Sequence, residues 1–263
     1  MNKILIMGLA LLAPFFYSCD FTPRIHKEVL KAQNLIAKQE YQKAIDNYEK
    51  ILVKNPPNEL KTKILYQIGD LYSLYLSKNK KSLKYYQEIK EITDSPLWLV
   101  KTEERLGDIN FLYLQDYEKS LTSYKLLSEF RPKLQKQDFY RFRYGLSLLN
   151  LDNLYEAANI FKEISEEKNS DYNIQSIYQL GLIQFQIKNW KGAVKYLNDY
   201  IKLESRRDNI VQAKFLMANA YETMEELKIA YNIYYSILGE YPNTEVVNQR
   251  LESIYKRRIA RKR

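Results

Sequence analysis

Cysteine and histidine are almost missing from this chain. Its 263 residues include one of each, Cys19 and His26. A structural zinc site needs about four ligands drawn mainly from these two residue types, and a disulfide needs two cysteines. The sequence therefore predicts no metal centre and no disulfide within the chain. We interpret His26, early in the first expected helix, as a surface residue rather than a base or a ligand.

Glycine and proline are also scarce, with seven of each. This scarcity favours an almost wholly helical, all-α fold. Because the glycines are dispersed, they form no glycine-rich phosphate loop, and we expect no cofactor. The acidic runs Glu103-Glu104 with Asp108 and Glu166-Glu167 are typical of the solvated faces of amphipathic helices. Since the sequence carries no catalytic constellation, we predict that the protein is not an enzyme.

Long hydrophobic runs are absent except at the N-terminus. The apolar run 4–17 follows a single cation, Lys3. It is shorter than the roughly 20 residues that span a bilayer as a helix, and its length is typical of a secretory signal. The sequence thus predicts a signal peptide over residues 1–18.

The segment FYSC, which ends at Cys19, resembles a bacterial lipoprotein processing site. The resemblance implies cleavage after Ser18, acylation of Cys19 and a short lipidated tether over residues 19–23. It also implies a lipid anchor in the bacterial cell envelope, facing the periplasm, with Asp20 leaving inner and outer membrane both open. Two other interpretations remain: an ordinary cleaved signal with an incidental cysteine, and an uncleaved anchor.

One helical pattern recurs along the rest of the chain. In residues 40–56 the side chains of Tyr41, Ala44, Tyr48 and Ile51 are spaced to share one helix face. The small residue of this pattern returns every 36 to 38 residues, at Ala44, Ser82, Ser120, Ala157, Ala193 and Ala230. Such a fixed period is the signature of a repeat architecture.

A second small residue precedes each of these by 12 or 13 positions. These residues are Ala32, Gly69, Gly107, Gly145, Gly181 and Ala218. Glycine inside a helix costs roughly 0.5–1 kcal/mol relative to alanine, so its repetition at one phase indicates closely packed helices. Each unit is predicted to be two antiparallel helices that cross at small residues.

This pattern resembles the tetratricopeptide repeat, whose first helix carries a Leu-Gly pair and whose second helix carries an alanine, an aromatic and a final proline. The resemblance implies a right-handed superhelical solenoid of about six antiparallel helical hairpins over residues 24–243. It also implies that the first helices line a concave groove that binds a partner. The groove positions would be Tyr66, Asp70, Glu104, Asp108, Phe111, Phe142, Tyr178, Phe185 and Phe215. Slight helix rotations would instead bury part of this set, and the 24 tyrosines are expected to serve mainly in packing.

Residues 244–263 are predicted to form a capping helix with a basic tail. Thr244 can cap this helix, and its apolar stripe would close the open end of the array. The tail carries Lys256, Arg257, Arg258, Arg261, Lys262 and Arg263, six charges of the formal net charge of +9. They are candidates for contact with anionic lipid headgroups or form a solvated terminus. A nucleic acid is not an expected partner of an exported chain.

Three hypotheses of function follow. The first is a membrane-anchored envelope lipoprotein that acts as a protein-interaction scaffold or adaptor, with envelope proteins or peptide segments as partners. Its plan is similar to the lipoprotein subunit of the outer-membrane β-barrel assembly machinery and to type IV pilus assembly lipoproteins. The second is a periplasmic carrier or sensor that binds a peptidoglycan fragment or another small ligand in the groove. The third is an uncleaved cytosolic adaptor.

Overall fold

The computed structural model describes residues 22–260, and over that range the chain is all-α, with no strand. The first helices of the hairpins are α1 (Thr22–Ala37), α3 (Asn58–Asp70) extended by the π turn η1 (Leu71–Tyr75), α5 (Pro96–Asp108) extended by the π turn η2 (Ile109–Leu114), α7 (Gln137–Asn150), α9 (Asn173–Gln186) and α11 (Arg207–Thr223). The second helices are α2 (Tyr41–Leu52), α4 (Asn79–Ile92), α6 (Tyr117–Glu129), α8 (Leu154–Glu166), α10 (Trp190–Leu203) and α12 (Leu227–Ser236), followed by α13 (Thr244–Ala260). The predicted signal peptide, Cys19 and residues 261–263 lie outside the described range.

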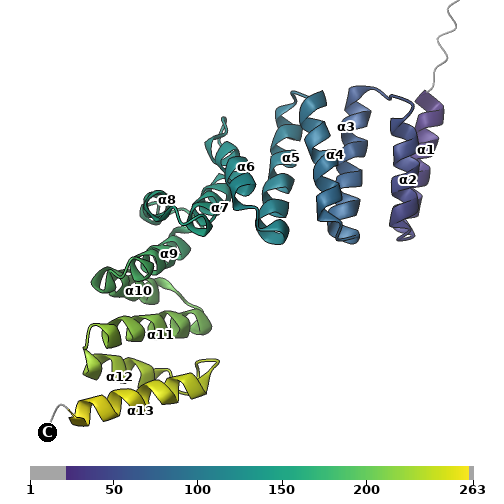
Figure 1. The fold of residues 1–263 in the computed structure, drawn as a ribbon. Helices are drawn as coiled ribbons and strands as arrows, with labels where there is room; N and C mark the ends of the chain where they lie inside the picture. Colours follow the sequence, from purple (N-terminus) through teal and green to yellow (C-terminus); the bar gives the residue numbers. More distant parts are fainter. Residues whose placement is uncertain (1–21, 261–263) are drawn as a thin grey trace, which may run out of the picture.

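The helices pack in successive antiparallel pairs, and α13 closes the series against α12. This confirms the predicted solenoid of six helical hairpins with a capping helix. In Figure 1 the helices α1 to α5 stand side by side in one row, and the row turns at α6 and α7 into a second limb that ends at α13. The array is therefore long and bent.

The hairpins are held by contact between a small residue and a ring or a leucine of the facing helix. All six small residues of the second helices are fully buried. A Cβ added at Gly69 would lie 2.7 Å from Cε1 of Tyr86, and one at Gly145 would lie 2.8 Å from Cε1 of Phe161. Since real Cβ atoms do not approach this closely, glycine is required by packing at these two crossings, as predicted.

Each hairpin turn contains one residue with positive φ. Its distance from the small residue of the first helix shows which hairpins carry an inserted residue. In four hairpins this residue is the seventh after the small residue of the first helix: Gln39, Asp152, Lys188 and Glu225. In the second and third hairpins it is the eighth, Ser77 and Gln115. These two hairpins are the ones with π turns, because a π turn accommodates one additional residue in a helix. The 13-residue spacings in the sequence are thus explained.

The cap of α13 differs from the prediction. The side chain of Asn243 accepts a hydrogen bond from the backbone N–H of Val246 at 3.1 Å, whereas the hydroxyl of Thr244 donates back to the carbonyl of Tyr241. Asn243 therefore caps the helix, and Thr244 is its first residue. A side-chain oxygen at the residue before the helix can reach the free N–H groups of the first turn, and Asn243 occupies that place.

We predict that Gly69→Ala and Gly145→Ala each lower the free energy of unfolding by about 1–3 kcal/mol, the usual cost of overpacking. The ring of Tyr86 cannot move aside freely because its hydroxyl is hydrogen-bonded to Asp70. Gly181→Ala is the matched control, since its Cβ would lie 3.1 Å from a methyl carbon of Leu197. Urea unfolding measures the three values. Equal effects at all three glycines would contradict the packing explanation.

Candidate interaction groove

The nine predicted groove residues are all half-buried, and all lie on first helices or on η2. The same residues therefore both line the groove and take part in helix packing, the two roles that the sequence left open. One part of each aromatic ring packs on a ring of the second helix while the rest stays open. The ring centroids of these pairs are 4.9–6.1 Å apart, namely Tyr66 with Tyr86, Phe111 with Tyr124, Phe142 with Phe161, Tyr178 with Tyr200, and Phe215 with Tyr234. The second helices therefore fix the groove aromatics in place.

At the front of the groove a cation joins two of the predicted residues. Arg105 of α5 places its Nε 3.0 Å from a carboxylate oxygen of Asp70 and 3.2 Å from the hydroxyl of Tyr66, to which it donates. Asp70 also accepts a hydrogen bond from the hydroxyl of Tyr86 at 2.7 Å. Sequence reasoning missed Arg105, although it lies two residues before Gly107 on the same first helix. This network ties the second hairpin to the third.

Asp108 occupies the equivalent place in the third hairpin. It accepts a hydrogen bond from the hydroxyl of Tyr124 at 2.7 Å. Burial raises the pKa of Asp108, while the hydrogen bond from Tyr124 and the nearby Arg143 oppose that shift. The guanidinium of Arg143 lies 4.7 Å from the ring centroid of Phe111 and 5.2 Å from that of Phe139, which is cation–π distance. The middle of the groove thus combines a half-buried carboxylate, a cation and partly open rings.

Whether the groove is polar or apolar at the residue after the small residue depends on the buried side chain that faces it from the second helix. Asp70, Asp108 and Asn219 each directly follow the small residue and accept a hydrogen bond from a buried tyrosine hydroxyl. In the fourth hairpin the tyrosine is replaced by Phe161, and in the fifth by Leu197, neither of which can donate; there the residue after the glycine is Leu146 or Leu182. A buried hydroxyl needs a partner, so in these five hairpins the two positions change together. In the first hairpin Gln33 follows Ala32, and no hydrogen bond joins it to the buried Tyr48.

A pocket of about 610 Å³ opens where the array bends. It is lined by Glu104, Asp108, Lys133, Gln135, Lys136, Asp138, Phe139, Asp171 and Tyr172. Two of its acids are paired, Glu104 with Lys136 at 2.6 Å and Asp138 with Lys133 at 3.4 Å. Asp108 and Asp171 form no ion pair with another described residue, so the pocket retains negative charge. An acidic, aromatic pocket of this size can receive a basic or aromatic side chain of a partner.

The interpretation of the acidic run around Glu103 as a solvated face is wrong for one member. Glu103 is 3% exposed; it pairs with Lys90 and accepts a hydrogen bond from the hydroxyl of Ser123 at 2.7 Å. The neighbouring Glu104 faces the pocket instead. Helix α5 lies between α4 and α6, so two of its faces are covered and consecutive acids meet different surroundings.

The basic residues near the C-terminus contact the array itself. Arg257 pairs with Glu222 at 3.0 Å and with Glu225, and Arg258 lies over the ring of Tyr231. Lys256 pairs with Glu252 on the outer face of α13. These contacts fasten α13 to the last hairpin. Arg257 and Arg258 are thus partly occupied, and the remaining predicted contacts Arg261, Lys262 and Arg263 lie outside the described range.

Within residues 22–260 no group of three or more His, Cys, Asp or Glu side chains is arranged to hold a metal ion. No helix in the same range is both long and apolar enough to cross a membrane.

Comparison with known proteins supports the repeat class. The tetratricopeptide repeat family model matches residues 175–204, which span α9 and α10. No curated protein matches the sequence. The fold is similar to that of the Naa15/Naa10 structure bound to HypK-THB, with a TM-score of 0.60, 15% identity and coverage of 89% of this chain but 34% of that chain.

Two shorter solved proteins are also similar. YrrB, a TPR protein with an unusual peptide-binding site, has a TM-score of 0.56 and 18% identity over 74% of this chain and 97% of its own. PilW, a widely conserved type IV pilus biogenesis factor, has a TM-score of 0.52 and 14% identity over 88% of this chain and 98% of its own. At these identities the likeness establishes the fold. A tetratricopeptide-type fold typically serves as a protein-interaction scaffold.

We predict that Tyr124→Phe lowers the free energy of unfolding by about 1–3 kcal/mol, because Asp108 loses the donor that satisfies it. Adding Asp108→Leu to this variant recreates the Leu–Phe pair of the fourth hairpin and should restore most of the loss. Tyr155→Phe is the control, since Tyr155 is 80% exposed. A double-mutant cycle by urea unfolding measures the coupling. Additive effects of the two substitutions would contradict the proposed dependence.

Proposed function

We propose that this protein is a membrane-anchored lipoprotein of the bacterial cell envelope whose tetratricopeptide-like groove binds a protein or peptide partner. The observation that carries the proposal is the pocket at the bend, lined by Glu104, Asp108, Phe139 and Tyr172. It lies on the first helices and the loops that lead into them, so it faces a partner laid along the groove. A scaffold or adaptor fits this surface best.

The solved relatives of this fold support a protein or peptide partner. YrrB is described as having an unusual peptide-binding site, and Naa15/Naa10 is bound to HypK-THB. PilW is a pilus biogenesis factor, and assembly of an outer-membrane or pilus machine is the kind of role we propose here. The retained negative charge of Asp108 and Asp171 favours a partner segment that carries lysine or arginine.

The proposed lipid anchor sets the orientation of the array. Helix α1 begins at Thr22, only three positions after Cys19. An extended chain covers at most about 3.6 Å per residue, so the start of α1 would lie within roughly 11 Å of the acylated residue. The edge formed by the beginnings of α1, α3 and α5 then faces the bilayer. The hairpin turns at the other ends of these helices face away from it.

The anchor is tested by the intact mass of the native protein extracted from membranes. We expect a mass that corresponds to cleavage before Cys19 plus acyl chains, because the thioether forms at that residue. Cys19→Ser should release the protein from the membrane fraction without changing its helical circular dichroism. An unmodified full-length mass would overturn the envelope location and leave the groove as a separate question.

The groove is tested by photo-crosslinking in living cells with p-benzoylphenylalanine in place of Tyr172. We expect a discrete adduct with one partner, because the pocket holds the ring of Tyr172 beside its occupant. The matched control places the same residue at Tyr155, which is exposed on the second helix α8. Equal labelling at both positions would contradict the proposal. Thermal stabilisation of the protein by peptidoglycan fragments, with no protein adduct, would indicate the carrier or sensor instead.

A further inference from the structure

The two π turns contain residues that remain largely exposed, although the ring of Tyr75 also stacks on that of Tyr41 of α2 at 4.5 Å. Phe111 of η2 packs edge-on against Tyr117 at 5.6 Å, as Phe185 of α9 packs against Trp190 at 5.0 Å. Phe111 and Phe185 both lie four positions after the glycine, so the register is still intact at Phe111. The inserted residue therefore follows it, and Leu112 has no counterpart in the fifth hairpin. Leu74 is the inserted residue of the second hairpin by the same register.

Both insertions expose a leucine followed by a tyrosine. Leu74 and Tyr75 are 52% and 53% exposed, and Leu112 and Tyr113 are 50% and 58% exposed. At the position of these tyrosines, two before the residue with positive φ, the other hairpins carry Ala37, Asn150, Gln186 and Thr223. Single exposed apolar residues are common on protein surfaces. The same pair at the same place in two neighbouring hairpins is a surface feature.

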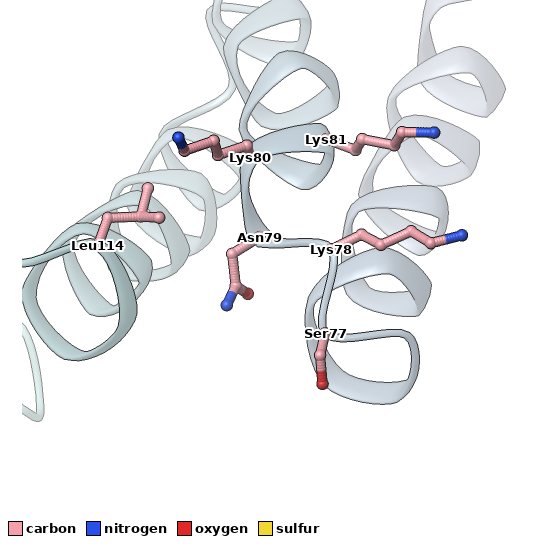
Figure 2. A pocket seen from close by; sticks show the side chains of 6 residues that line it. All are labelled: Ser77, Lys78, Asn79, Lys80, Lys81 and Leu114. Atoms are coloured by element: carbon pink, nitrogen blue, oxygen red, sulfur yellow. The ribbon is translucent and has the colours of Figure 1, made fainter.

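The two pairs lie along one edge of the array. Both π turns end at hairpin turns of consecutive repeats, and η2 contacts α4, the helix that follows η1. A pocket of about 350 Å³ lies between the turn of the second hairpin and the end of η2, lined by Ser77, Lys78, Asn79, Lys80, Lys81 and Leu114. Figure 2 shows the side chain of Lys80 directed toward Leu114, with those of Lys78 and Lys81 directed to the other side. The lysines therefore point to both sides of the pocket and do not converge on one small anion.

The cations of this edge lack carboxylate partners. Lys78, Lys80 and Lys84 are exposed and form no ion pair with any residue in the range 22–260. Asp116, which follows η2, is paired with Lys119. An exposed surface with apolar pairs and unpaired lysines complements a segment that is both acidic and apolar.

We propose that Leu74, Tyr75, Leu112 and Tyr113, with Lys80 of the intervening pocket and Lys84 about one turn further along α4, form a second docking surface for an acidic segment of a partner protein that presents apolar side chains. We name this surface the π-turn ledge. It is a different site from the pocket at the bend, and it has the opposite charge. In the orientation proposed above, the membrane-facing edge lies near Thr22, at the beginnings of the first helices. The ledge is at the opposite ends of these helices, and the 18 residues of α3 and η1 correspond to a length of about 27 Å. On this proposed orientation, a protein is favoured over a lipid surface.

The ledge is tested by fluorescence anisotropy with the full chain and three labelled synthetic peptides. In the first peptide leucines and glutamates share a helical spacing; in the second the glutamates become lysines; in the third the leucines become serines. We expect the first peptide to bind, and the other two to bind at least about tenfold more weakly. The binding should weaken as salt is added.

Two independent sets of substitutions locate the binding. Lys80→Glu with Lys84→Glu reverses the charge, and Leu74→Asn with Leu112→Asn removes the apolar contacts; each should weaken the first peptide by about tenfold or more. Because these side chains are exposed, the helical circular dichroism should be unchanged. Lys191→Glu with Lys195→Glu, at the same spacing on α10, is the matched control and should bind as the unmodified chain does.

Three outcomes would overturn the ledge. They are no binding of the first peptide, binding that is insensitive to both ledge variants, and lysine-dependent binding to phosphatidylglycerol vesicles without binding to the peptide. The last outcome would assign the edge to anionic lipid. None of them affects the crosslinking at Tyr172, so a failure of the ledge and a failure of the groove are distinguishable.

Discussion

The whole array depends on the close approach of two helices at each small residue. At Gly69 and Gly145 the facing ring occupies the space that a Cβ would need. That contact sets the distance between the helices of a hairpin and thereby the angle at which the next hairpin stacks. A repeat array has no single core, so these crossings are repeated for each hairpin and stability accumulates along the chain.

The chemistry of the groove derives from the same crossings. In the second, third and sixth hairpins the buried ring is a tyrosine whose hydroxyl needs a partner, and the residue after the small residue supplies the acceptor. Asp70 and Asp108 supply acceptors for this reason, whereas Leu146 follows the glycine where the facing residue, Phe161, has no hydroxyl. The groove is thus polar at the front and apolar behind it as a consequence of packing. A partner meets a charge pattern that the core has already determined.

The bent array offers two surfaces of opposite charge. The pocket at the bend retains the charge of Asp108 and Asp171, whereas the π-turn ledge carries unpaired lysines. With a lipid anchor close to α1, the ledge would face away from the bilayer. A scaffold with this arrangement can hold a basic segment and an acidic segment at the same time, which suits the assembly of several components at a membrane.

The sequence by itself determined the fold class, the six hairpins and the packing residues. Those features depend on contacts between residues close in the chain, which appear as a period and as small residues at fixed spacing. Only the tertiary structure decided that Glu103 is buried by Lys90 and Ser123, and that Arg105 joins Asp70 to Tyr66. It also decided that the two extra residues form π turns that expose Leu74 and Leu112. Each of these depends on which neighbouring helix covers a given face, and the spacing of residues along one helix carries no information about that.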